Sequence, residues 1–436
     1  MDALLVLTNV AVLLLLGSLC SLLAKKLRIS DVLVLLLLGL VIGRISYNSQ
    51  SLFAFDNSLL AAIGVLALIM VVFDTASRFR LKEHGAFSPQ AFRITGLFVL
   101  FNVLLVPLFF SLVFFQEISL MSVLLSLIFA LVVIATDLDA VLVMLKDYAG
   151  QKAKSLLSLL QTEAIISTGL VVIIPFIIID IIRNVWLLQT SASSSPWNLL
   201  MLLLFQLIVG IGSGVVVGLI VLRSLQKLYS HNFSSVSLLA GVLIAYLLAE
   251  NLGGNGALAV AALGFLFGRF YVKEKPKLQE FSYMLSNSLE ILVFILLGII
   301  IKIPFTLAFI LGSLLIFFII ILSRMGAVFT VLRKDYSLRE KLFIGFNMPK
   351  GVATAVILFA LALYNYAPFE LLLQLILVLM IYSLILSTIV DKLSWKFVKD
   401  EKAAVEKVSL DLIKASPKKR AKKRKRINNK KLANRK

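Results

Sequence analysis

The stretch Ala135-Thr136-Asp137-Leu138-Asp139 decides how the rest of the sequence is interpreted. It places two carboxylates two residues apart inside a run made otherwise of Leu, Ile, Phe, Val and Met. A run of that length and composition is typical of a segment that spans a lipid bilayer. An ionised carboxylate at that depth costs several kcal/mol, about 2.5–3.5 on insertion scales. Because residues that carry this cost are commonly functional, we expect Asp137 and Asp139 to belong to an ion site.

The composition indicates the class of protein. Of the 436 residues, 60% are hydrophobic, whereas soluble domains contain about 45–50% apolar residues. The single cysteine, Cys20, excludes an internal disulfide, and the two histidines, His84 and His231, do not form a metal-ligating cluster. No catalytic triad, phosphate-binding loop or dinucleotide fingerprint occurs at a plausible spacing. The sequence therefore predicts a polytopic membrane protein that is not an enzyme and has no cofactor.

Apolar runs of bilayer-spanning length recur along the chain. The predicted fold class is all-α, with about 13 transmembrane helices. The run 304–333 is long enough to be a tilted span with a cytoplasmic extension. The predicted spans are 3–24, 29–45, 58–75, 94–115, 121–145, 155–183, 198–222, 235–251, 256–270, 281–302, 304–333, 341–364 and 368–395.

The connections between these runs alternate in charge. Every second connection is rich in Lys and Arg, beginning with residues 25–28, and the others carry few basic residues. The positive-inside rule makes the basic connections cytoplasmic. This predicts a multi-pass protein of the cell membrane, with the N-terminus outside and the C-terminus in the cytoplasm.

The end of the chain differs from the rest. We divide the chain into a transmembrane domain, residues 1–400, and a basic tail, residues 401–436. Residues Ser416–Lys436 carry 12 Lys and Arg and no acidic residue, within a formal net charge of +20. Because such a segment cannot bury apolar area, we predict a disordered cytoplasmic tail held near anionic lipid. Nucleic acid is a less favoured partner, since no aromatic residues interleave with the basic ones.

The spans are expected to form an internal repeat. The loop-like stretch Ser191–Pro196 separates two halves of about six spans each, and spans five and twelve then hold matching positions. Both spans are interrupted by polar residues. Interrupted segments at corresponding positions are typical of transporters with inverted repeats. We predict two broken helices that cross near the middle of the membrane.

The sixth span carries polar residues as well. Glu163 and Ser167 are four residues apart and share a helix face, and Thr168 lies next to it. Ser167 and Thr168 have a purely structural alternative, in which they bond to their own helix and allow close packing. Glu163 has no such alternative and requires a partner.

Lys350 lies at the interruption of span twelve, between a proline and a glycine that weaken a helix. A buried ammonium requires a carboxylate. Glu163 and Glu290 are the candidates, and Asp137 or Asp139 stay open.

These motifs, in this order, resemble the monovalent cation/proton antiporter family, in particular the prokaryotic sodium/proton exchangers. The resemblance extends over nearly all of residues 1–395. It rests on Ala24–Leu33 with Leu38–Gly43, on Phe73-Asp74, on Ala135-Thr136-Asp137, on Leu248–Gly264, and on Pro349-Lys350-Gly351, where the family has Arg in place of Lys.

The resemblance implies secondary antiport of H⁺ against Na⁺, or alternatively Li⁺ or K⁺, by alternating access in a homodimer. It also implies an ion pair between Glu163 and Lys350, and no metal site beyond that of the transported cation. The residues expected to bind the cation or carry the proton are Thr136, Asp137, Asp139, Glu163, Ser167 and Thr168.

One departure from the family pattern concerns the proton. The family's sixth span has Glu-Ser-x-x-Asn-Asp, and its last Asp binds the ion and carries the proton. Alignment on Glu163 puts Ser167 at the Asn and Thr168 at that Asp. Our hypothesis is that Asp139 takes over the titratable role. The alternative function is a cation channel or uniporter, or a homologue that transports nothing.

Overall fold

The computed structural model describes residues 3–27, 29–47, 50–51, 55–78, 88–116, 119–137, 151–182, 196–227, 231–332, 336–363 and 367–393. Asp139 and the basic tail lie outside these residues. The predictions made for them, including the division of the chain at residue 400, therefore stay predictions.

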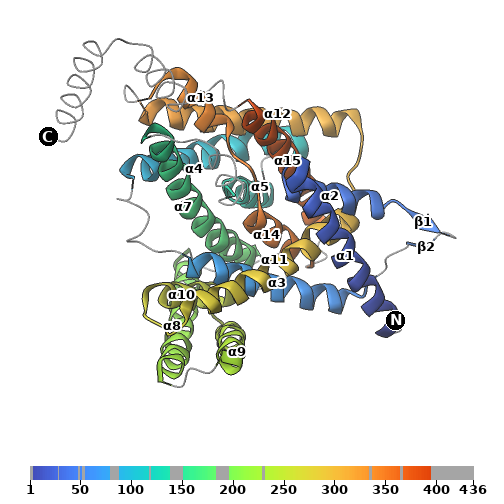
Figure 1. Cartoon of the computed structure of the whole chain (residues 1–436). Coiled ribbons are helices and arrows are strands. Elements are labelled where there is room, and N and C mark those ends of the chain that lie inside the picture. Colours follow the sequence, from blue (N-terminus) through green and yellow to red (C-terminus); the bar gives the residue numbers. More distant parts are fainter. Residues whose placement is uncertain are drawn as a thin grey trace, which may run out of the picture.

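The described chain is almost entirely helical, as predicted (Figure 1). Its single ladder joins β1 (Ser46–Tyr47) and β2 (Gln50–Ser51) in the connection after α2. The helices are α1 (Ala3–Leu27), α2 (Asp31–Ile42), α3 (Asn57–Ser77), α4 (Pro89–Phe110) with the π-helical turn η1 (Ser111–Phe115), α5 (Leu120–Val132), α7 (Gln151–Ile182), α8 (Pro196–Lys227), α9 (His231–Asn251), α10 (Gly256–Arg269), α11 (Lys275–Ile300), α12 (Leu307–Val331), α13 (Leu338–Phe346), α14 (Val352–Leu363) and α15 (Ala367–Lys392).

Every predicted apolar run overlaps with one or two of these helices, although the run 121–145 is described only as far as Asp137. Within the described residues, eight helices are long and apolar enough to cross a membrane, namely α1, α3, α4 with η1, α8, α9, α11, α12 and α15. Four shorter apolar helices, α2, α5, α10 and α14, accompany them. In lipid, backbone N–H and C=O groups must find hydrogen-bond partners within the protein, and a helix pairs them internally. Apolar segments of membrane-spanning length are therefore expected to be helical.

Side chains at the helix starts fix several of the boundaries. The Ser337 hydroxyl accepts a hydrogen bond from the Glu340 N–H at 3.3 Å, and the Glu340 carboxylate accepts one from the Ser337 N–H at 2.7 Å. This capping box satisfies donors that a helix start otherwise leaves unpaired. The capping box fixes the start of α13, the helix that precedes the interruption in span twelve.

Close helix packing forms the interior around the interruptions. Between α3 and α10, the rings of Phe73 and Phe267 lie 5.5 Å apart. A Cβ at Gly264 would lie 2.9 Å from the Phe73 carbonyl oxygen, so α10 approaches α3 through a residue without a side chain. In Figure 1, α5 and α14 lie near the centre of the view, with longer helices around them.

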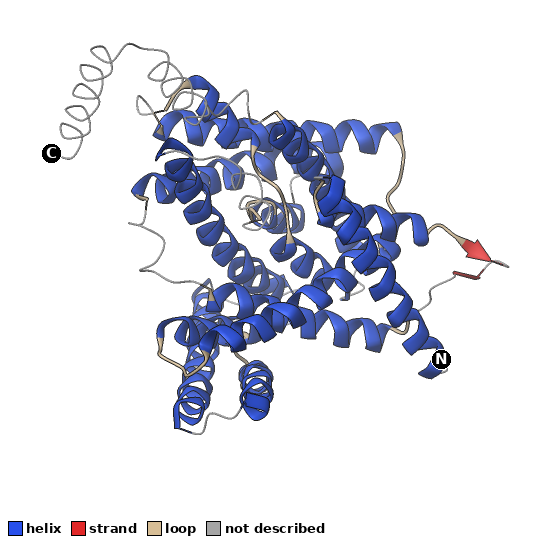
Figure 2. Ribbon diagram, viewed as in Figure 1, coloured by secondary structure: helices blue, strands red, loops and turns tan. Residues whose placement is uncertain are grey.

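Two helices stop inside the bundle. α5 ends at Val132, and residues 135–137 continue without helical structure. α13 ends at Phe346, residues 347–351 are not helical, and α14 starts at Val352. Figure 2 shows these segments as tan loops between helices near the middle of the molecule. The interruption of span twelve is therefore confirmed. In span five the structure describes the end of α5 and the non-helical residues up to Asp137, and the continuation of that span stays a prediction.

Candidate functional site

The two interruptions meet through their backbones. The Asp137 N–H donates a hydrogen bond to the Pro349 carbonyl at 2.8 Å. The Thr354 hydroxyl, one turn into α14, donates to the Val132 carbonyl at 3.3 Å. Carbonyls freed at the end of α5 and at the break before α14 thus find partners across the crossing, as groups in lipid require.

The Asp137 carboxylate lies against the other break. A Cβ at Gly351 would overlap the Asp137 carboxyl group, so only glycine allows the two segments to approach this closely. Pro349 supplies no N–H and cannot continue α13. The Lys350 N–H donates to the Ser383 hydroxyl of α15 at 3.3 Å, which holds the break on its outer side.

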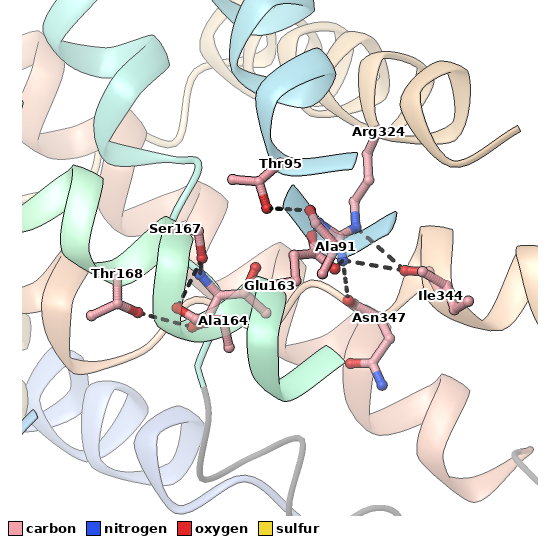
Figure 3. A network of polar contacts seen from close by, with 10 residues as sticks. Ala91, Thr95, Glu163, Ala164, Ser167, Thr168, Arg324, Ile344 and Asn347 are labelled. Atoms are coloured by element: carbon pink, nitrogen blue, oxygen red, sulfur yellow. Dashed lines mark hydrogen bonds and ion pairs between the residues drawn. The ribbon is translucent and has the colours of Figure 1, made fainter. Parts of the chain in front are cut away.

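Two hydroxyls of α7, those of Ser167 and Thr168 (Figure 3), hold the backbone N–H and carbonyl of Thr136. The Thr136 N–H donates to the Ser167 hydroxyl at 3.3 Å, and the Thr168 hydroxyl donates to the Thr136 carbonyl at 3.3 Å. Ser167 also donates to the Ala164 carbonyl at 3.1 Å. Ser167 therefore bonds to its own helix, as the structural alternative predicted, and also links α7 to the broken segment. The hydroxyl of Thr136 itself is buried and has no hydrogen-bond partner among the described residues.

Glu163 forms its ion pair with Arg324 of α12 (Figure 3). Arg324 Nη1 binds Glu163 Oε1, and Nη2 lies 3.2 Å from Oε2. The same guanidinium donates to the carbonyls of Asn347 at 3.0 Å and Ile344 at 3.3 Å. The side chains are 1% and 0% exposed. A bidentate pair with additional acceptors is the arrangement in which buried charges are tolerated.

The predicted pair between Glu163 and Lys350 is therefore wrong. Lys350 is 2% exposed, and its Nζ has no hydrogen-bond partner in the part of the chain that the structure describes. It lies 5.9 Å from the centre of the Phe98 ring, and the Arg324 guanidinium lies 5.4 Å from the same ring. The other candidate, Glu290, accepts a hydrogen bond from Ser286 on its own helix α11 at 3.0 Å.

Arg324 is the residue that the sequence reading missed. It had a signal of its own, since an arginine inside an apolar run is costly and needs a partner. In the structure Arg324 lies inside α12, fully buried, and its orientation toward α7 follows from helix packing that the sequence does not encode locally.

The structure thus brings together Thr136, Asp137, Ser167 and Thr168, with Glu163 beside them on α7. Asp139 lies outside the described residues. The cluster offers one carboxylate that lies against the broken segment, hydroxyl oxygens and carbonyls, which are the ligands that a hard monovalent cation takes. No group of three or more metal-ligating side chains was found among the described residues.

Comparison with known proteins identifies the family of this chain. Residues 11–393 match the family described as "Sodium/hydrogen exchanger, transmembrane". This chain belongs to the sodium/hydrogen exchanger family. A curated member, the Na(+)/H(+) antiporter 1 of Methanocaldococcus jannaschii, is 23% identical over 364 residues, which cover 79% of this chain and 80% of the relative.

The fold agrees with the family assignment. The structure of the sodium proton antiporter MjNhaP1 from Methanocaldococcus jannaschii at pH 8 has a TM-score of 0.70 at 22% identity and covers 91% of this chain and 98% of its own. A structure of the same antiporter from an electron-microscopy map has a TM-score of 0.67 at 22% identity, covering 91% and 97%. Members of the exchanger family are multi-pass membrane transporters, and cation/proton exchange is the activity that homology assigns to this exchanger.

Proposed function

We propose that this exchanger carries H⁺ against Na⁺ by alternating access at the crossing of α5 with the α13–α14 break. One observation supports this above the others, namely that the Asp137 carboxylate lies at the meeting point of two interrupted helices. Interrupted helices near the midplane supply backbone and carboxylate oxygens to a coupling ion. A carboxylate that a cation and a proton occupy in turn is sufficient for exchange.

The ligand set follows from the contacts. Asp137 provides the charge. The Thr136 hydroxyl, which has no partner among the described residues, is a neutral ligand. Ser167 and Thr168 use their hydroxyl hydrogens within the protein and keep oxygen lone pairs for a cation. Glu163 is already engaged by Arg324, so we assign it to positioning α7 against α12 and no longer to ion binding.

The wider arrangement is part of the same proposal. We place about 13 spans in two inverted halves, with the N-terminus outside and the basic tail on cytoplasmic anionic lipid. The charge alternation of the connections supports the orientation, and the paired interruptions support the repeat. The family resemblance supports a homodimer.

The direct test is flux in proteoliposomes that contain the purified protein and a pH-sensitive dye. After an inside-acid ΔpH is imposed, adding Na⁺ outside should collapse it, and Li⁺ and K⁺ added in turn should rank the cations. Asp137→Asn, which removes the charge and keeps the shape, should abolish the response. Absence of any cation-driven collapse in the wild type would contradict the proposal, and so would electrical current without exchange.

A second experiment concerns the proton carrier. Under our hypothesis, Asp139 titrates in place of the carboxylate that Thr168 replaces. Asp139→Asn should therefore remove the pH dependence of exchange in everted vesicles, whereas Asp31→Asn, at the start of α2, should leave it unchanged. If Asp139→Asn retained wild-type pH-dependent exchange, the proton would be carried elsewhere.

A further inference from the structure

Helix α4 also lies against the site, although the sequence did not implicate it. The inward face of α4 carries Phe98, Asn102, Val106 and Phe110, each four residues after the last, and all are buried. Asn102 is 0% exposed, and neither its Oδ1 nor its Nδ2 has a hydrogen-bond partner among the described residues. Buried side-chain amides almost always have partners, so this one calls for an explanation.

One end of this face is fixed at the crossing. The ring of Phe98 lies 5.9 Å from Lys350 Nζ, and Lys350 follows the Pro349 carbonyl that binds the Asp137 N–H. Asn102 lies one helical turn, about 6 Å, further along the same face.

The other end is fixed by α5. The rings of Phe110 and Phe129 lie 4.8 Å apart, and the hydroxyls of Ser111 and Ser126 lie 3.4 Å apart. These contacts pair α4 and α5 in antiparallel order. Continuing that order brings the end of α5, at Val132, to about Val106, and the non-helical residues after it to the level of Asn102.

Asn102 therefore lies level with Thr136, whose hydroxyl is likewise buried and has no partner among the described residues. Two buried oxygens at one level of the bundle, both without partners among the described residues, are costly unless something else binds them. An amide oxygen and a hydroxyl oxygen are ligands for hard cations. Resting on the proposed function, we infer that Asn102 is a further cation ligand of this exchanger and that its Oδ1 binds the transported ion beside Thr136 and Asp137.

The test is the Na⁺ dependence of exchange in Asn102→Leu, a change that keeps the size of the side chain and removes its oxygen. The half-saturating Na⁺ concentration should rise about tenfold, as expected for losing one ligand to a charged group. The maximal rate should stay at the wild-type level, because the lost contact stabilises bound cation throughout the cycle.

Asn9→Leu is the matched control. Asn9 is a buried asparagine whose Nδ2 has no hydrogen-bond partner among the described residues, but it lies on α1, whose main described contacts are with α2 and α11. Its substitution should leave the half-saturating Na⁺ concentration unchanged. An equal rise in both variants would overturn the inference, because it would show a general packing effect.

Asn102→Asp keeps an oxygen at the position and adds charge, so it should lower the half-saturating Na⁺ concentration. This variant decides the question if Asn102→Leu does not fold. An unchanged Na⁺ dependence in either folded Asn102 variant would overturn the inference.

A binding readout separates this inference from the proposed function. Na⁺ that binds the folded state raises the melting temperature of the purified protein in detergent. Asn102→Leu should reduce that rise, and Asn9→Leu should not. A wild type that is stabilised by Na⁺ without exchanging protons would contradict the proposed function while leaving the role of Asn102 intact. An undiminished rise in Asn102→Leu would overturn that role.

Discussion

Two buried polar clusters lie side by side in this exchanger, and they differ in how fully they are satisfied. In the first, Glu163 and Arg324 bind each other through two contacts, and two backbone carbonyls accept from Nε and Nη2 of the guanidinium. In the second, at the crossing, the described residues leave the hydroxyl of Thr136, the amide of Asn102 and the Lys350 Nζ without hydrogen-bond partners. Both clusters are removed from solvent.

The difference separates a structural contact from a site. A saturated cluster has nothing left to bind, so its contribution is to hold α7 and α12 at a fixed distance. In the second cluster, the oxygens of Thr136 and Asn102 are costly at similar depth unless a ligand binds them. The sequence alone does not separate the two clusters, since each consists of polar residues in apolar runs.

The largest effect should follow from breaking the saturated cluster. Arg324→Met leaves the Glu163 carboxylate buried without a partner, which should lower the free energy of unfolding by about 3–5 kcal/mol. Denaturant unfolding in mixed micelles measures this loss. The double variant Glu163→Gln/Arg324→Met removes both charges and should recover most of it. A double variant no more stable than Arg324→Met would show that the ion pair is not the cause.

A smaller effect should follow from cutting one link between the clusters. Thr168→Val removes the hydroxyl that donates to the Thr136 carbonyl and should cost about 1 kcal/mol of unfolding free energy. Thr162→Val is its control on the same helix, because the bond of the Thr162 hydroxyl among the described residues lies within α7, to the Ser158 carbonyl at 2.7 Å. Such bonds add little to stability. Equal losses in both variants would argue against a link between α7 and the crossing.

The smallest loss should come from Lys350. Because its Nζ has no hydrogen-bond partner among the residues that the structure describes, Lys350→Met removes a buried charge there without creating another. The unfolding free energy should stay unchanged or rise, in contrast to Arg324→Met. Lys350→Arg retains a charge and should be less stable than Lys350→Met. A loss in Lys350→Met as large as in Arg324→Met would show that the two cations are equally engaged.

The sequence predicted the parts of this molecule that depend on local chemistry. Apolar runs of bilayer length gave the helices, and the Pro349-Lys350-Gly351 interruption gave a break where the structure has one, because proline and glycine act on their own backbone. The partner of Glu163 could not be predicted in this way. Arg324 is 161 residues away, and only the packing of α12 against α4 and α13 turns it toward α7. Asn102 was overlooked for the related reason that an uncharged residue in a span costs less and gives a weaker signal.

The backbone hydrogen bond between Asp137 and Pro349 has a mechanical consequence. Together with the bond from Thr354 to Val132 and the close approach at Gly351, it fastens two segments that are more than 200 residues apart in the chain. Sliding one interrupted helix past the other would break these bonds and drive the Asp137 carboxyl group into the opposite backbone. The two interrupted segments therefore form one rigid unit. Any motion that exposes the site to one side and then the other must move both broken helices together, and the protein must bend elsewhere.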